Sequence, residues 1–209
     1  MREKVENVLR LLDEWYPTED KCYLNYQNEW QLLIATILSA QCTDDRVNIV
    51  TKDLFKKYTS IEDFAGADLT VLERDIKSTG FYRNKAKNII LACRMLLQKY
   101  NSVMPSEVDE LITIPGVGRK TANVVRSHIF NLPSIVVDTH VKRISKKLGF
   151  TKSDDPVKIE FELMEIFPKE HWIRYNTQII AHGRKICKAR KPECEICPLR
   201  DFCDEYMKT

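Results

Sequence analysis

The sequence predicts an all-α protein with two helical lobes. Apolar residues recur at intervals of three and four along several segments, which is the period of an amphipathic helix. The one β-like run is "SIVV" at 134–137, and a solitary run of four residues does not make a sheet. The 209 residues, of which 44% are apolar and 30% are charged, suit one large domain or two small lobes.

Helical segments can be placed in order along the chain. The first has one apolar face, made of Val5, Val8, Leu9, Leu12 and Tyr16. The second has another, made of Trp30, Leu33, Ile34, Ile37 and Leu38. Capping boxes at "TVLE" (70–73) and "SEVD" (106–109) predict two further helix starts. Pro156 fits the first position of a later helix, because its missing N–H would be unpaired there anyway.

The net charge of +3 is unevenly distributed. Between 111 and 152 there are eight Lys or Arg and a single acid, Asp138, and "RKICKARK" at 184–191 contains five cations and no acid. One such run is usually a solvated face, but two in an otherwise acidic chain favour a polyanion-binding surface. The longest apolar stretch falls short of the ~20 residues that span a bilayer, and the charged N-terminus does not resemble a signal peptide. We therefore expect an intracellular protein with no membrane segment.

The motif "IPGVGRK" at 114–120 predicts a tight turn between two helices. Pro115 ends the first helix, and Gly116 and Gly118 can adopt positive φ. Without a Cβ, both glycines also let another molecule approach the backbone. The amides that open the next helix form the positive end of its dipole, which suits a phosphate. Taken alone, the turn is as well explained by a plain helical hairpin, but it opens the most basic segment of the chain.

Four of the seven cysteines lie in the last 23 residues with the spacing C-x6-C-x2-C-x5-C: Cys187, Cys194, Cys197 and Cys203. In an intracellular chain this crowding favours metal ligation over disulfides. The basic segment around them favours thiolates, which are good ligands for a soft metal. Ligand type alone does not separate a zinc ion from a [4Fe–4S] cluster.

Together these motifs resemble the helix-hairpin-helix DNA glycosylases, and among them the endonuclease III family. The resemblance rests on segments in family order with family spacing: "LSAQCTDD" (38–45), "IKSTGFYRNKAKNI" (76–89), "LITIPGVGRKTANVV" (111–125), "VVDTHVKRISKKLG" (136–149) and the cysteine tail. It implies two lobes that flank a DNA-binding cleft. Residues 22–132 would form a six-helix barrel lobe with the helix-hairpin-helix. Residues 1–21 and 133–209 would form a second lobe, with an iron–sulfur loop at 187–203.

Lys120 and Asp138 each have two interpretations. Taken alone, Lys120 is a phosphate-binding cation, and Asp138 caps the helix that follows it. A positive helix terminus, Arg119 and partial burial would favour a neutral, nucleophilic amine at Lys120. A fixed carboxylate at Asp138 would stabilise positive charge on a sugar. The resemblance implies that both are catalytic.

The resemblance also implies how DNA is held. Gln41 and Phe81 would fill the space of a base that is flipped out of the duplex, although a helix cap and a core position are simpler interpretations of these two residues. Phe81 stands where many bacterial members have leucine. The expected DNA contacts are Gln41, Phe81, Gly116, Gly118, Arg119, His140, Arg184 and Lys191. The cysteine spacing favours a [4Fe–4S] cluster over zinc.

The implied function is that of a bifunctional DNA N-glycosylase and AP lyase of base excision repair. It would remove oxidised pyrimidines of the thymine glycol type through a Schiff base on Lys120, and would then cut 3′ to the abasic site by β-elimination. One alternative is a mismatch-specific glycosylase acting on T or U opposite G, and another is a non-enzymatic DNA-bound redox protein. The partner would be double-stranded DNA with damaged bases or abasic sites. We expect a cytoplasmic, nucleoid-associated monomer in a prokaryote.

Overall fold

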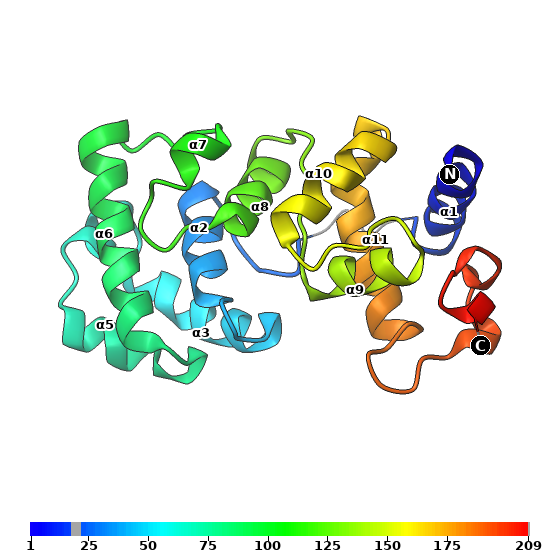
Figure 1. The fold of residues 1–209 in the computed structure, drawn as a ribbon. Coiled ribbons are helices and arrows are strands. Elements are labelled where there is room, and N and C mark those ends of the chain that lie inside the picture. Colours follow the sequence, from blue (N-terminus) through cyan, green and yellow to red (C-terminus); the bar gives the residue numbers. More distant parts are fainter. Residues whose placement is uncertain (18–21, 209) are drawn as a thin grey trace. The chain divides into compact units, whose positions relative to one another are not determined.

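The computed structural model describes residues 1–17 and 22–208, and within them every regular element is a helix (Figure 1). The all-α prediction is therefore confirmed. The β-like run at 134–137 is buried but belongs to no strand. The chain divides into two compact units, which we call the hairpin unit (Cys22–Leu132) and the cysteine unit (Met1–Lys21 with Pro133–Thr209).

The hairpin unit surrounds one helix that is buried on all sides. Its elements are α2 (Glu29–Leu38), α3 (Asp44–Lys57), α4 (Ile61–Ala65), α5 (Leu69–Asp75), a 3₁₀ turn η1 (Lys77–Thr79), α6 (Tyr82–Tyr100), α7 (Val108–Leu111) and α8 (Arg119–Ile129). Helix α2 packs against α3, α6 and α8 (Figure 1), and every residue from Gln31 to Leu38 is buried. The sequence predicted one apolar face for this helix. All faces of the helix are buried from Gln31 onward because it forms the centre of the unit.

Side-chain caps fix several helix starts in the hairpin unit, but not always at the predicted residues. Helix α5 is capped by Asp68, which accepts from the N–H of Val71 at 3.0 Å, so the box expected at 70–73 does not form. Helix α7 begins after Glu107 and has a single turn, so the box at 106–109 is also absent. The capping box that does form joins Ser60 and Asp63 at the start of α4.

The cysteine unit is built on a pair of long helices, α1 (Arg2–Trp15) and α11 (Trp172–Lys185). Helix α11 packs against both α1 and α9 (Figure 1). The remaining elements are α9 (Thr139–Lys147), α10 (Pro156–Ile166) and the 3₁₀ turns η2 (Lys169–His171), η3 (Cys194–Ile196), η4 (Arg200–Phe202) and η5 (Tyr206–Lys208). Pro156 is the first residue of α10, as predicted. Buried apolar side chains of α1, α9, α10 and α11 form a single core.

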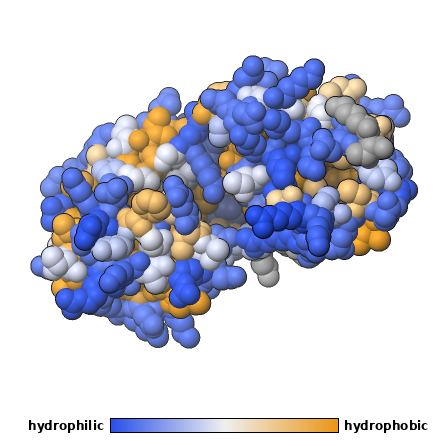
Figure 2. Space-filling model, turned by 60° about the horizontal axis from the view of Figure 1, so that its bottom comes forward, coloured by the Kyte–Doolittle hydropathy of each residue, from blue (hydrophilic) through white to orange (hydrophobic). Residues whose placement is uncertain are grey.

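The molecular surface is mostly polar. Figure 2 shows a face on which hydrophilic residues surround scattered apolar ones. Among residues 1–17 and 22–208, every helix is too short or too polar to span a membrane.

The turn between α7 and α8 depends on one glycine. Gly116 has φ +81°, and a Cβ built there would lie 2.9 Å from Cβ of Asn88 on α6. Gly118 has φ −92° and open space around it, so only Gly116 adopts the left-handed backbone that the sequence allowed for both. Gly118 is the N-cap of α8, and it has no side chain that could cover the opening of that helix.

We expect Gly116→Ala to lower the free energy of unfolding by about 1–3 kcal/mol, because it combines backbone strain with a clash against Asn88. Gly118→Ser, which supplies a favourable N-cap in open space, should change that free energy by no more than about 0.5 kcal/mol. Urea unfolding of both variants measures the difference. Equal losses would contradict the assignment of the strained position to Gly116.

Candidate functional site

Lys120 lies in the first turn of α8, directly after the Gly116 turn. Its side chain is exposed, so the partial burial expected from the sequence is not found. The neighbouring Arg119 is half-buried. An exposed cation at an uncovered helix N-terminus is accessible to an anionic ligand such as a DNA phosphate.

Asp138 is the N-cap of α9, as one of its two interpretations predicted. A carboxylate oxygen of Asp138 accepts from the N–H of Val141 at 2.8 Å, and the residue is half-buried. This bond fixes the carboxylate at the positive end of the α9 dipole.

Gln41 and Phe81 share an unusual backbone conformation. Gln41 follows α2 with φ 53°, and Phe81 precedes α6 with φ 47°. Left-handed backbone costs on the order of 1 kcal/mol at a residue with a side chain, and it is rare for a bulky one. Both side chains are exposed, Phe81 by 63%. The simpler interpretation of Phe81 as a core residue is therefore wrong, because its ring projects from a strained turn into solvent.

A buried lysine joins the two turns that carry these residues, and the sequence analysis did not identify it. Nζ of Lys85 on α6 donates to the carbonyl of Leu38 at 2.8 Å and to that of Thr79 at 2.7 Å. Its residue exposure is 4%, and burial lowers the pKa of the amine from its ordinary value. The motif "NKAKNI" gives no sign of this, because the Leu38 carbonyl lies 47 positions away along the chain and only the fold brings it to Lys85.

The remaining predicted DNA contacts lie in the cysteine unit. His140, in the first turn of α9, is half-buried and packs closely on α11. A Cβ built on Gly183 of α11 would lie 2.3 Å from Nδ1 of His140. Arg184 and Lys191 are exposed, and Lys191 has φ 55°. The sequence analysis missed Gly183, because a glycine inside a helix gives no indication of which side chain needs its space.

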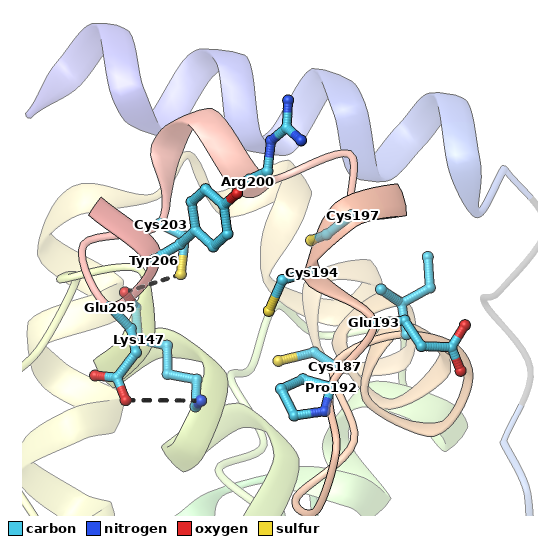
Figure 3. Close-up of a pocket in the computed structure, with 11 residues that line it drawn as sticks. Lys147, Cys187, Pro192, Glu193, Cys194, Cys197, Arg200, Cys203, Glu205 and Tyr206 are labelled. Atoms are coloured by element: carbon cyan, nitrogen blue, oxygen red, sulfur yellow. Dashed lines mark hydrogen bonds and ion pairs between the residues drawn. The ribbon is translucent and has the colours of Figure 1, made fainter. Parts of the chain in front are cut away.

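The four cysteines of the C-terminal segment line one pocket of about 230 Å³. Figure 3 shows their sulfur atoms around a common space, with residues of the same segment closing the sides. Within the described residues, no three Cys, His, Asp or Glu side chains are placed to hold one metal ion. A zinc ion lies about 2.3 Å from each sulfur ligand and fills the space between them. Four cysteine sulfurs around one common space are also the donor set of a polynuclear iron–sulfur group.

Residues of α9 and α11 form hydrogen bonds and close contacts with residues 187–203, which we call the cysteine segment. A guanidinium nitrogen of Arg143 donates to the carbonyl of Cys187 at 2.7 Å, and the Cys203 thiol donates to the carbonyl of Lys147 at 3.5 Å. Nε2 of the buried His182 lies 3.6 Å from Sγ of Cys197. The other ring nitrogen of His182 is 3.0 Å from the hydroxyl of Tyr16, the C-cap residue of α1.

The thiols do not have the environment that the basic sequence suggested. Burial raises the pKa of Cys187, although Lys147 and Arg143 act in the opposite direction. Burial also raises the pKa of Cys197, to about 11. At Cys187 the loss of water outweighs the positive charges of Lys147 and Arg143. Metal binding here has to displace protons from the thiols.

Comparisons with known proteins agree with this arrangement. Residues 34–169 match the family described as "HhH-GPD superfamily base excision DNA repair protein". Residues 187–203 match the "Iron-sulfur binding domain of endonuclease III". The matched segment begins at Cys187 and ends at Cys203, and the match indicates that the chain carries a [4Fe–4S] cluster.

Full-length relatives extend the match. Endonuclease III of Synechocystis sp. is 48% identical over 203 residues, which are 97% of this chain and 92% of the relative. Endonuclease III of Bacillus subtilis is 46% identical, over 98% of this chain and 94% of the relative. A solved structure described as a trapped endonuclease III–DNA covalent intermediate superposes with a TM-score of 0.94 and 48% identity. That superposition covers 100% of this chain and 98% of the other. These similarities show that the chain belongs to the endonuclease III family, within the HhH-GPD superfamily of base excision DNA repair proteins.

Proposed function

We propose that this base excision repair glycosylase and AP lyase removes oxidised pyrimidines of the thymine glycol type from double-stranded DNA. Lys120 would form the covalent link to the sugar, and the strand would be cut 3′ to the abasic site. The observation that carries the proposal is the placement of Lys120, an exposed amine in the first turn of a helix whose N-cap is glycine. We further propose that the protein acts as a monomer in the cytoplasm.

The chemistry proposed for Lys120 has two stages. Its neutral amine attacks C1′ of the extruded nucleotide, the C1′–N bond breaks, and the base leaves with the bonding electrons and a proton. The sugar ring then opens to an imine between Nζ and C1′. Loss of a proton from C2′ allows the C3′–O bond to break, which cuts the strand. Water finally hydrolyses the imine and regenerates the amine.

Asp138 supplies the negative charge in this proposal. Positive charge develops on the sugar as the base departs, and a carboxylate held by the N–H of Val141 can stabilise it with little reorganisation. Asp138 can do this while it caps α9, because the bond from Val141 uses one of its carboxylate oxygens.

The remaining predicted residues bind DNA in this proposal. Gln41 and Phe81 enter the space of the extruded base, which their exposed positions on strained turns support. The backbone at Gly116 and Gly118 binds phosphate together with Arg119. His140, Arg184 and Lys191 contact the DNA backbone from the cysteine unit. Phosphate contacts of this kind position the duplex without reading its sequence.

The cluster has a structural role in this proposal. When bound by Cys187, Cys194, Cys197 and Cys203, it supplies a cross-link between parts of the C-terminal segment. Arg143 and the carbonyl of Lys147 attach that segment to α9. The basic residues at 184–191 lie on both sides of Cys187, so a cross-link at that cysteine would limit their freedom and order them for phosphate binding.

Wild-type protein should release thymine glycol from a duplex, nick the strand and form a covalent adduct with the DNA under borohydride. Lys120→Ala should form no adduct and should lose base release by roughly 10³-fold or more, because the nucleophile is gone. A panel of duplexes with single defined lesions, scored separately for base release and scission, measures both activities. Activity confined to T or U opposite G would favour a mismatch glycosylase. Intact DNA throughout would favour a pure binder.

Asp138→Asn should keep the cap on α9, because an amide oxygen can still accept from Val141, but should lower base release by about 10²–10³-fold. Asp138→Ala should lose a similar amount of activity and also about 1 kcal/mol of stability, since it removes the cap. Single-turnover kinetics and urea unfolding separate the two effects. Near wild-type activity of Asp138→Asn would show that the negative charge is not needed.

Purified protein should contain about four iron and four sulfide ions per chain and should absorb broadly in the visible range. Cys194→Ser should lose most of this absorption and unfold at a lower temperature, because one ligand of the cross-link is missing. Cys42→Ser, which alters a half-buried thiol of the hairpin unit, should keep the absorption. Stoichiometric zinc in a colourless wild-type protein would contradict the cluster.

A further inference from the structure

Lys85 occupies a position that neither its sequence context nor the proposed chemistry explains. It lies in the first turn of α6 and is buried, yet the structure gives it two neutral carbonyls as hydrogen-bond acceptors, those of Leu38 and Thr79. Burying an ammonium is costly unless its hydrogen bonds are satisfied with good geometry. A methionine of similar volume would fill the same space without that cost, so packing alone does not account for a lysine here.

The two acceptor carbonyls belong to residues that lie a few positions before Gln41 and Phe81, the residues proposed to enter the duplex. Leu38 is the last residue of α2 and precedes Gln41 by three positions, while Thr79 precedes Phe81 by two. The backbone N–H of Lys85 also donates to the carbonyl of Phe81 at 3.1 Å. Lys85 thus contacts both sides of the Gly80–Phe81 turn and the end of the helix that leads to Gln41.

The other hydrogen bonds of these turns are local. The N–H of Cys42 donates to the carbonyl of Ser39 at 3.1 Å, and the N–H of Gly80 donates to that of Lys77 at 3.3 Å. Such bonds shape each turn separately. In the described residues, the hydrogen bonds that run from one turn to the other pass through the Lys85 ammonium, which acts in a low-dielectric interior where such bonds are strong.

We propose that Lys85 is a positioning residue that fixes the Gln41 turn and the Phe81 turn relative to each other, so that both side chains enter the duplex together. This inference rests on the proposed function, because it assumes that Gln41 and Phe81 fill the space of the extruded base. The ammonium touches neither the DNA nor the reacting sugar. Its effect is transmitted through the carbonyls of Leu38 and Thr79, and loss of alignment by about 1 Å can lower a rate by about 100-fold.

The test variant is Lys85→Met, which keeps the length of the side chain and removes its donors. Arg94→Met is the matched control. Arg94 lies on the same helix, and its Nε donates to the carbonyl of Ala65 at the end of α4 at 2.8 Å, away from both turns. Both variants remove one cation that binds a helix C-terminal carbonyl. Arg94 is exposed whereas Lys85 is buried, so urea unfolding of both variants has to report any difference in stability separately from activity.

The first measurement is base release from a thymine glycol duplex, compared with borohydride trapping on a single-stranded abasic oligonucleotide. Lys85→Met should lose about 10- to 100-fold in base release, because the duplex has to be opened. It should still form the adduct with the single strand, where no base needs to be extruded. Arg94→Met should behave like wild type in both assays. Equal base release by the two variants would overturn the proposal.

The second measurement follows insertion directly. 2-Aminopurine is placed opposite a tetrahydrofuran abasic analogue, and its fluorescence is recorded as the protein binds. Wild type and Arg94→Met should change the fluorescence, and Lys85→Met should change it less at saturating protein. If Lys85→Met does not fold, Lys85→Gln replaces it, because its side chain is one bond shorter than lysine and its amide cannot reach both carbonyls. Its signal should then fall below that of wild type. A wild-type signal from Lys85→Gln would then count against the proposal.

A double-mutant comparison distinguishes positioning from independent damage. If Lys85 acts through the two turns, adding Lys85→Met to the Gln41→Ala, Phe81→Ala variant should lower base release little further. A full additional loss would show that Lys85 acts elsewhere. Failure of the proposed function itself looks different, because wild type and Arg94→Met would then form no adduct and release no base.

Discussion

The burial of α2 is the constraint on which the hairpin unit depends. A helix that is apolar on all sides must be covered on all sides, and α3, α6 and α8 provide much of that cover. The orientation of α8 therefore follows from packing against α2, and so does the direction in which its N-terminal turn opens. The end of α2 at Leu38 is fixed in the same way, which gives Lys85 a rigid acceptor.

The parts of the site that depend on local chemistry could be predicted from the sequence. The turn at 114–118 and the cap at Asp138 are properties of neighbouring residues, and both occur where they were expected. The role of Lys85 could not be predicted, because its acceptors lie 47 and 6 positions away along the chain. The same limit explains the capping boxes at 70–73 and 106–109, where tertiary packing selected other N-cap residues.

The cysteine segment shows where counting charges along a sequence misleads. Five cations at 184–191 suggested that the thiols would ionise readily, but several of these side chains point to solvent while the sulfurs face a pocket. Burial is therefore the larger influence on Cys187 and Cys197. The ligand spacing nevertheless indicated the kind of centre through its resemblance to the endonuclease III family, and residues 187–203 match the iron–sulfur binding domain of that family.

The contact between His140 and Gly183 has a consequence for how this protein can evolve. Glycine weakens a helix interior by about 1 kcal/mol relative to alanine, so drift towards larger residues at 183 would otherwise be favoured. The imidazole of His140 occupies the space that any side chain at 183 would need. Positions 140 and 183 are therefore expected to covary among homologues, with a larger residue at 183 tolerated only where the residue at 140 is small.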